Sequence, residues 1–134
     1  MLSPFDQRRL VKAAIAARKR AVAPYSKFQV GAALLTRKGE IIGGANVESA
    51  SYGLTCCAER VALFKALTEG KKDFIAVAVV ANGAVSPCGA CRQLLIEYAP
   101  KAEVFVADPA TPTDIRRHTV AGLLPAAFSA FSRE

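Results

Sequence analysis

The chain has 134 residues, of which 52% are hydrophobic and 22% charged, with a formal net charge of +7. Such a chain buries roughly 65–70% of its unfolded surface, which excludes a disordered protein and predicts a single domain over residues 1–134. Its hydrophobic runs are all shorter than the ~18 residues of a membrane span, which excludes a helical membrane protein.

The distribution of charge bears on location and partners. Residues 1–20 carry charges throughout and lack the continuous hydrophobic centre of a signal peptide, so we expect a cytoplasmic protein with reduced thiols. The basic residues are scattered and do not alternate with aromatic ones, which argues against a nucleic-acid partner. The high hydrophobic fraction with few charges predicts a buried interface between subunits.

The first half of the chain predicts a helix followed by a hairpin. Ser3 and Pro4 are typical of a helix start, and Pro24 ends this helix. Residues 28–36 then form a strand, Lys38-Gly39 the turn, and residues 40–45 the second strand. A polar segment follows, over residues 46–53.

The second half predicts alternating helices and strands. Thr55 is a candidate cap for a helix over residues 56–68. Further along come a buried strand over residues 74–81, a helix over 87–98, a strand over 103–107, a loop over 108–113, a short extended piece over 114–119 and a helical turn over 120–124. Such an alternation implies a crossover and at least one parallel pair of strands.

All four cysteines lie in two short stretches, residues 55–60 and 86–93, each at a predicted helix N-terminus. The positive end of a helix favours thiolate over thiol. Cys88 and Cys91 are three residues apart and so share a helix face. In a cytoplasmic protein we favour a metal site over disulfides, and three thiolates hold a zinc ion with one position left open for catalysis.

The third ligand comes from the adjacent pair Cys56 and Cys57, which point about 100° apart on a helix, so that only one of them binds. We choose Cys57, because Glu59 two residues on is then placed to move protons for a water activated by zinc. Three thiolates leave a net charge near −1. Arg60 is either a surface charge or, as we favour, a compensating partner of the sulfur atoms.

In these residues the chain resembles the small cytidine deaminases, zinc enzymes that convert free cytidine and deoxycytidine to the uridines. The resemblance covers nearly the whole chain. It is carried by residues 25–28, by residues 46–52, by Cys57-Ala58-Glu59-Arg60, by residues 87–93, and by Leu123-Leu124-Pro125 with Phe128. The wider zinc deaminase superfamily includes a three-cysteine variant and has the same glutamate and Pro-Cys-x-x-Cys motif.

The resemblance implies a three-layer α/β/α sandwich around a five-stranded mixed sheet, one zinc ion per subunit, and a homotetramer whose sites share residues across interfaces. It implies Cys57, Cys88 and Cys91 as ligands and Glu59 as the proton carrier. The substrate contacts that it implies are Phe28 on the pyrimidine, Asn46 and Glu48 on the ribose, the Ala58 backbone on the base edge, Tyr52, and Phe128 from a neighbouring subunit. Without the family, Phe28 would be a strand-core residue, and Asn46 and Glu48 turn residues.

Two alternatives stay open at this point. The substrate is a modified cytosine nucleoside such as an aminoacylnucleoside antibiotic, or the protein is a basic RNA-binding module in which all four cysteines hold a structural zinc. The second alternative requires Cys56 on the metal. His118, remote from both cysteine stretches, is expected to be an ordinary surface or packing residue.

Overall fold

The structure is a computed structural model that describes residues 2–128. Its helices are α1 (Pro4–Arg18), the 3-10 turn η1 (Tyr52–Leu54), α2 (Ala58–Thr68), α3 (Gly89–Tyr98) and α4 (Val120–Leu123). Its strands are β1 (Gly31–Thr36), β2 (Ile41–Ala45), β3 (Phe74–Val80), β4 (Glu103–Ala107) and β5 (Arg116–Thr119).

The five strands form one sheet in the order β2-β1-β3-β4-β5. β1 pairs antiparallel with both β2 and β3, β3 pairs parallel with β4, and β4 pairs antiparallel with β5. The parallel pair, β3 and β4, is connected through α3, as the predicted alternation required. The sheet is therefore mixed.

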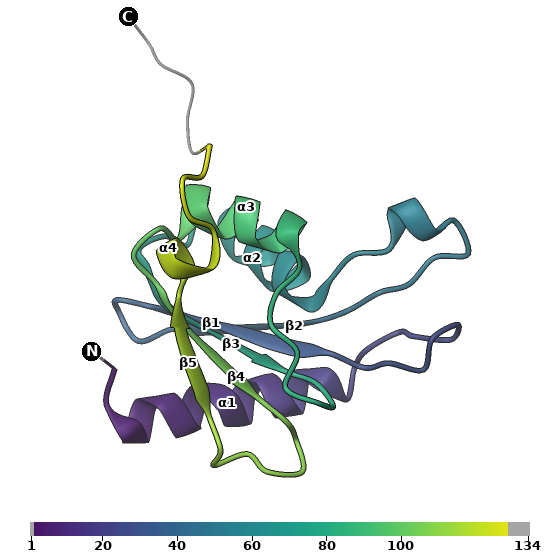
Figure 1. Cartoon of the computed structure of the whole chain (residues 1–134), viewed down its shortest axis with the longest axis horizontal. Coiled ribbons are helices and arrows are strands. Elements are labelled where there is room, and N and C mark those ends of the chain that lie inside the picture. Colours follow the sequence, from purple (N-terminus) through teal and green to yellow (C-terminus); the bar gives the residue numbers. More distant parts are fainter. Residues whose placement is uncertain (1, 129–134) are drawn as a thin grey trace, which may run out of the picture.

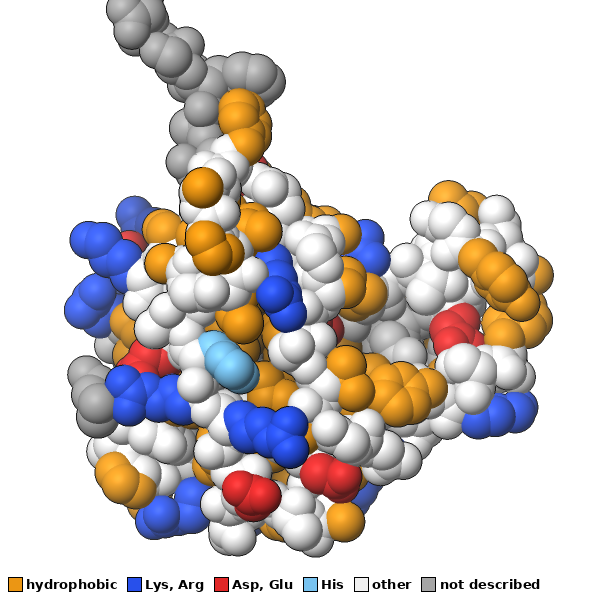
Figure 2. Space-filling model, viewed as in Figure 1, with side chains coloured by type: hydrophobic (Ala, Val, Ile, Leu, Met, Phe, Trp, Pro, Cys, Tyr) orange, Lys and Arg blue, Asp and Glu red, His pale blue; other side chains and the backbone are white. Residues whose placement is uncertain are grey.

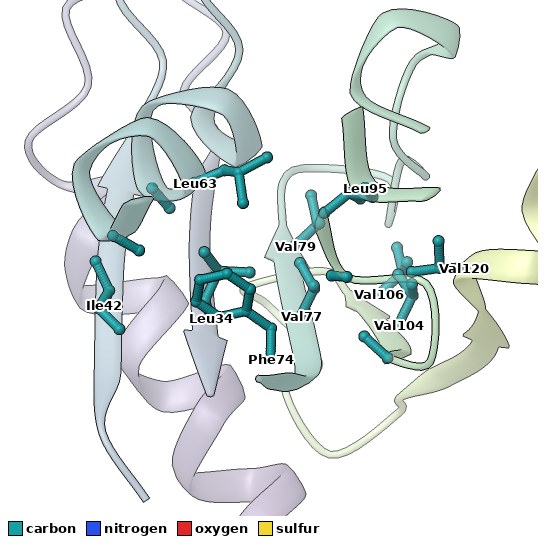
Figure 3. Packing of buried hydrophobic residues seen from close by; sticks show 14 residues of the cluster. Leu34, Ile42, Leu63, Phe74, Val77, Val79, Leu95, Val104, Val106 and Val120 are labelled. Atoms are coloured by element: carbon teal, nitrogen blue, oxygen red, sulfur yellow. The ribbon is translucent and has the colours of Figure 1, made fainter. Parts of the chain in front are cut away.

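Helices cover both faces of this sheet (Figure 1). Helix α1 packs on one face, where Leu10, Val11 and Ala14 meet alternate residues of the central strands. Helices α2 and α3 cover the opposite face, and Figure 3 shows Leu63 and Leu95 pointing from these helices toward the valines of β3 and β4. The predicted three-layer α/β/α sandwich is confirmed.

The central strand β3 explains why both faces are covered. Its side chains alternate between the two hydrophobic clusters: Val77 and Val79 point to α2 and α3, whereas Ala76 and Ala78 point to α1. A strand with apolar residues on both sides is stable only between two apolar layers. The strand therefore holds the N-terminal ends of α2 and α3 on one side of the sheet.

Some predicted boundaries were wrong. The first strand begins at Gly31 rather than Phe28, since the residues before it are held by a side chain instead of a strand ladder, as described below. Thr55 does not cap α2. Its hydroxyl accepts a hydrogen bond from the Ser49 N–H at 3.1 Å, and the helix begins two residues later than expected, at Ala58. Helix α3 likewise begins at Gly89 rather than at residue 87.

A long segment over residues 46–56 projects from the body of the molecule and carries η1 at its tip (Figure 1). Hydrophobic side chains gather on this projection (Figure 2), among them Tyr52 and Leu54, which are 78% and 75% exposed. Within residues 2–128, none of the helices has the length and hydrophobicity to cross a membrane. His118 is exposed on β5, as expected.

Candidate active site

Two cysteines occupy the cap positions at the N-termini of neighbouring helices. Cys57 precedes α2 and Cys88 precedes α3, each in extended backbone conformation and each without the side-chain hydrogen bond that a capping residue usually makes. Cys91 lies in the first turn of α3 and is buried. The positive ends of both helices thus point to the region where these three sulfur atoms meet.

The three sulfur atoms of Cys57, Cys88 and Cys91 lie within 4.8 Å of one another. The Cys57 and Cys88 sulfurs are 3.7 Å apart, and those of Cys88 and Cys91 are 3.5 Å apart. A tetrahedral zinc ion with bonds of about 2.3 Å separates its sulfur ligands by about 3.8 Å. The trio therefore fits zinc. Cys56, partly buried, is not in this group.

The charges around the trio indicate that it needs a cation. The hydrogen bond with the Cys91 thiol, followed by the one from Arg60, lowers the pKa of Cys57 to about 5. The same contact with Cys57, together with burial, raises the pKa of Cys91. The two shifts have opposite directions, so the Cys57 sulfur loses its proton more readily than the Cys91 sulfur. Three thiolates this close repel one another unless a positive ion binds them.

Arg60 supplies part of the positive charge. Its Nη2 lies 3.3 Å from the Cys57 sulfur, and this contact raises the pKa of the guanidinium. Among the described residues, its buried Nε has no hydrogen-bond partner. A surface charge would not be held in this way, so the interpretation of Arg60 as a partner of the sulfur atoms agrees with its position.

Glu59 is the buried carboxyl group of the site. Its side chain is only 5% exposed and lines the same cavity as Cys57 and Cys88. Burial raises the pKa of this carboxyl, and the charge of Cys57 raises it further. A carboxyl with a raised pKa is suited to accept a proton and pass it on near neutral pH.

The cavity between the two helix ends has a volume of about 230 Å³. Six of the residues predicted from the sequence line it: Phe28, Asn46, Cys57, Ala58, Glu59 and Cys88. Its other lining residues are Val30, Thr55, Val79, Val85 and Ser86. The wall is thus mainly apolar, with a small number of polar groups, which is the usual composition of a small-molecule site.

Asn46 shapes one wall of the cavity. Its Oδ1 accepts a hydrogen bond from the Val30 N–H and its Nδ2 donates to the Phe28 carbonyl, both at 2.9 Å. These bonds replace the ladder that a strand over residues 28–30 would make. Asn46 is 7% exposed, and Phe28 next to the cavity is 38% exposed.

Three predicted substrate residues lie outside this cavity. Glu48 and Tyr52 line a separate hollow of about 370 Å³, which shares the lining residue Thr55 with the cavity. Phe128 lies on the C-terminal arm, residues 124–128, 60% exposed, where its carbonyl accepts a hydrogen bond from Gln93 Nε2. Within one chain, therefore, Phe128 does not reach the cavity.

Sequence reasoning missed most of the apolar lining and the polar group of Ser86. Val30 and Val79 were assigned only to strands, and no local pattern distinguishes a cavity valine from a core valine. Ser86 stands two residues before Cys88 and was interpreted only as part of a helix start. The signal in the sequence that could have marked Ser86 as a cavity residue is its closeness to Cys88, a predicted metal ligand.

Residues 5–107 match the family described as "Cytidine and deoxycytidylate deaminase zinc-binding region". The cytidine deaminase of Halalkalibacterium halodurans is 55% identical over 128 residues, covering 93% of this chain and 96% of the relative. The cytidine deaminase of Sporosarcina psychrophila is 48% identical over 127 residues, covering 92% of each chain.

A crystal structure of cytidine deaminase from Burkholderia pseudomallei has the same fold. Its TM-score is 0.84 at 49% identity, and the alignment covers 90% of this chain and 97% of the other. The match thus extends from the zinc-binding stretches to nearly the full length of the chain. From its sequence, its fold and its sulfur trio, this chain belongs to the cytidine deaminase family of zinc-binding hydrolases.

Proposed function

We propose that the protein catalyses the zinc-dependent hydrolytic deamination of free cytidine and deoxycytidine to uridine and deoxyuridine, with release of ammonia, in pyrimidine salvage. The observation that carries this proposal is that the sulfurs of Cys57, Cys88 and Cys91 lie together, and that Cys57, Cys88 and the buried Glu59 line one small cavity. The residues from 1 to 134 act as one catalytic domain that holds one zinc ion.

The sulfur atoms of Cys57, Cys88 and Cys91 would hold the metal. When bound, zinc supplies the Lewis acidity that makes a water molecule nucleophilic near neutral pH. Arg60 and the two helix N-termini offset the negative charge of the thiolates, which would otherwise weaken that effect.

Glu59 moves the protons of the reaction. Its carboxylate takes a proton from the water as the water oxygen attacks carbon 4 of the cytosine ring, and delivers it to ring nitrogen 3. It then passes the second proton of the water to the amino group on carbon 4. The bond between carbon 4 and that nitrogen breaks, and ammonia leaves with uridine as the other product.

The cavity walls hold the base. Phe28 packs on the pyrimidine ring, and the Ala58 backbone binds the edge of the base at the start of α2. Asn46 holds the Phe28–Val30 segment through its amide group and uses its remaining hydrogen-bonding capacity toward the ribose. The apolar floor formed by Val30 and Val79 excludes water beneath the base.

The neighbouring hollow holds the sugar. Glu48 and Tyr52 line it, and Thr55 lines both the hollow and the cavity, so a nucleoside with its base in the cavity would direct its ribose toward Glu48. The Glu48 carboxylate accepts hydrogen bonds from the Tyr25 and Ser26 N–H groups at 3.0 and 3.1 Å. The Ser26 hydroxyl donates to the other carboxylate oxygen, and the hydrogen-bonding capacity that remains would serve a ribose hydroxyl.

We also propose that the protein is a homotetramer. Support comes from the exposed hydrophobic side chains of the projecting segment, among them Tyr52 and Leu54, which a second copy would cover. Phe128 of one subunit would then reach the base in a neighbouring subunit.

The small cavity and the scattered basic residues favour free nucleosides over nucleic acid as the substrate. Free cysteines at the ligand positions favour a cytoplasmic location, where thiols stay reduced.

The test is an assay on the zinc-loaded protein. Cytidine and deoxycytidine are added, and the shift of the ultraviolet spectrum from cytosine to uracil is followed together with the zinc content per chain. We expect turnover with one zinc per chain. Zinc at that stoichiometry without turnover of either nucleoside would overturn the proposal, and a panel that includes an aminoacylnucleoside antibiotic shows whether a modified cytosine is the better substrate.

A further inference from the structure

Arg92 connects three groups that belong to two separate parts of the chain. It lies in the first turn of α3, partly buried, and each of its nitrogen atoms donates one hydrogen bond. Nε donates to the Pro87 carbonyl at 2.7 Å, and Nη2 donates to the Ser86 hydroxyl oxygen at 3.0 Å. Nη1 donates to the Leu123 carbonyl at 2.9 Å, at the end of α4.

One of these acceptors, Ser86, lines the cavity, and another, Pro87, joins it to Cys88. The segment from residue 82 to residue 88 lies between β3 and α3 without regular secondary structure, so no strand or helix ladder fixes it. Ser86 lines the cavity and Cys88 contributes one of the three sulfurs. The bonds from Arg92 hold the two residues that directly precede that cysteine.

The third acceptor, Leu123, lies at the base of the C-terminal arm. The neighbouring side chain Gln93 donates to the Phe128 carbonyl further along the same arm. Consecutive residues of α3 therefore hold both ends of residues 123–128. The helix that carries Cys91 at its first turn is the common support of the metal site and of the arm.

We propose that Arg92 is a positioning residue that fixes the Ser86–Cys88 segment relative to the sulfur trio and joins it to the base of the arm. A guanidinium has its donors in a rigid planar fork and can satisfy several acceptors at once, whereas a lysine ammonium is a compact point charge. Because Arg92 donates to the Ser86 oxygen, that hydroxyl can present its own hydrogen to a ligand in the cavity.

The consequence is measurable on the metal as well as on the reaction. Groups that orient metal ligands from outside change metal affinity or activity by about 10–100-fold when they are replaced. For turnover, the inference rests on the proposed function. For metal retention it does not, because the release of zinc is measured without substrate.

The experiment compares the zinc-loaded full chain with Arg92→Lys, which keeps the charge but not the fork, and with Arg116→Lys on the exposed strand β5 as the matched control. Zinc release to an excess of a coloured chelator, the unfolding rate and the kcat and KM for cytidine are measured for each. For Arg92→Lys we expect zinc release at least about 10-fold faster and a similar fall in kcat, with KM within about twofold and unfolding unchanged.

A rate of zinc release and a kcat equal to those of Arg116→Lys would overturn the proposal, and so would zinc release that accelerates only as much as unfolding.

If Arg92→Lys does not fold, Ser86→Ala decides, since it removes one acceptor only. A lower kcat at unchanged melting temperature supports the proposal, and an unchanged kcat overturns it. If the unmodified chain does not deaminate cytidine, the proposed function fails. Zinc release then decides the role of Arg92: faster release from Arg92→Lys, or from Ser86→Ala, supports that role, and unchanged release overturns it.

Discussion

Gly44 on β2 lies directly against the backbone of Ala62 on α2. A Cβ atom at Gly44 would come within 2.5 Å of the Ala62 nitrogen and within 2.9 Å of the Ala58 carbonyl oxygen. The absence of a side chain at this position therefore lets the first turns of α2 rest on the sheet. Those turns carry Glu59 and follow Cys57.

Gly44→Ala will push the start of α2 away from the sheet. We expect a loss of about 1–3 kcal/mol in the free energy of unfolding, as for other overpacked positions, and weaker zinc binding. Denaturant unfolding and metal titration check this. Gly53→Ala is the matched control, because no atom beyond its two chain neighbours lies within 4 Å of a Cβ built there, and an equal effect of both changes would refute the packing argument.

Glu59→Gln will keep the fold and the zinc but lower kcat by about 10²–10⁴-fold, because an amide cannot accept and return the proton. The spectrophotometric assay and the zinc content measure the two effects. Glu69→Gln, at the opposite end of α2, serves as the control. Activity within tenfold of the unchanged protein would remove the proton-carrier role from Glu59.

Replacing the cysteines one at a time will separate the ligands from their neighbour. Cys88→Ala leaves two sulfurs and will lose zinc, whereas Cys56→Ser, outside the trio, will retain it. Metal analysis after gel filtration distinguishes the two. Zinc loss from Cys56→Ser would point instead to the structural four-cysteine site.

Arg60→Gln will retain zinc but lower kcat, since the thiolate charge on Cys57 is then no longer offset by the guanidinium 3.3 Å away. We expect a reduction of about 10–100-fold. Lys65→Gln removes an equal charge from the exposed face of the same helix and should change little. The same small effect for both variants would make Arg60 a surface charge.

The bonds of Glu48 predict a dependence on pH. The Ser26 hydroxyl, then the Ser26 and Tyr25 backbone N–H groups, lower the pKa of this carboxyl in the folded protein. Its stabilisation of residues 25–26 is therefore present above the ordinary glutamate pKa of about 4.3 and is lost as the pH falls through the lowered value.

The measurement for Glu48 is amide hydrogen exchange at Tyr25 and Ser26. At pH 7, Glu48→Gln should exchange faster than the unchanged protein, and the difference should shrink in acid as the native carboxyl takes up a proton. A constant difference at all pH values would show that the charge of Glu48 does not hold this loop. Glu97→Gln, on the exposed face of α3, is the control.

The order of elements and the sulfur trio could be predicted because they follow from local patterns. The valine-rich run of β3 required cover on both faces, and the spacing of Cys88 and Cys91 placed both at the start of one helix. The choice of Cys57 over Cys56 followed from the position of Glu59 two residues on, and the structure places Cys57, not Cys56, within reach of Cys88.

The parts that could not be predicted depend on contacts between residues distant in sequence. Phe28 precedes the strand because the Asn46 amide, 18 residues away, holds its carbonyl. Arg92 reaches Leu123 across 31 residues. No periodicity marks a side chain that bonds to a distant backbone group, so such residues appear in the sequence as ordinary turn or helix-surface positions.

The place of β3 in the chain also couples metal binding to folding. Cys57 lies before this strand and Cys88 after it, and the strand is inserted between β1 and β4. The native trio therefore requires the centre of the sheet to be folded. A metal bound there would in turn stabilise the folded chain over the unfolded one.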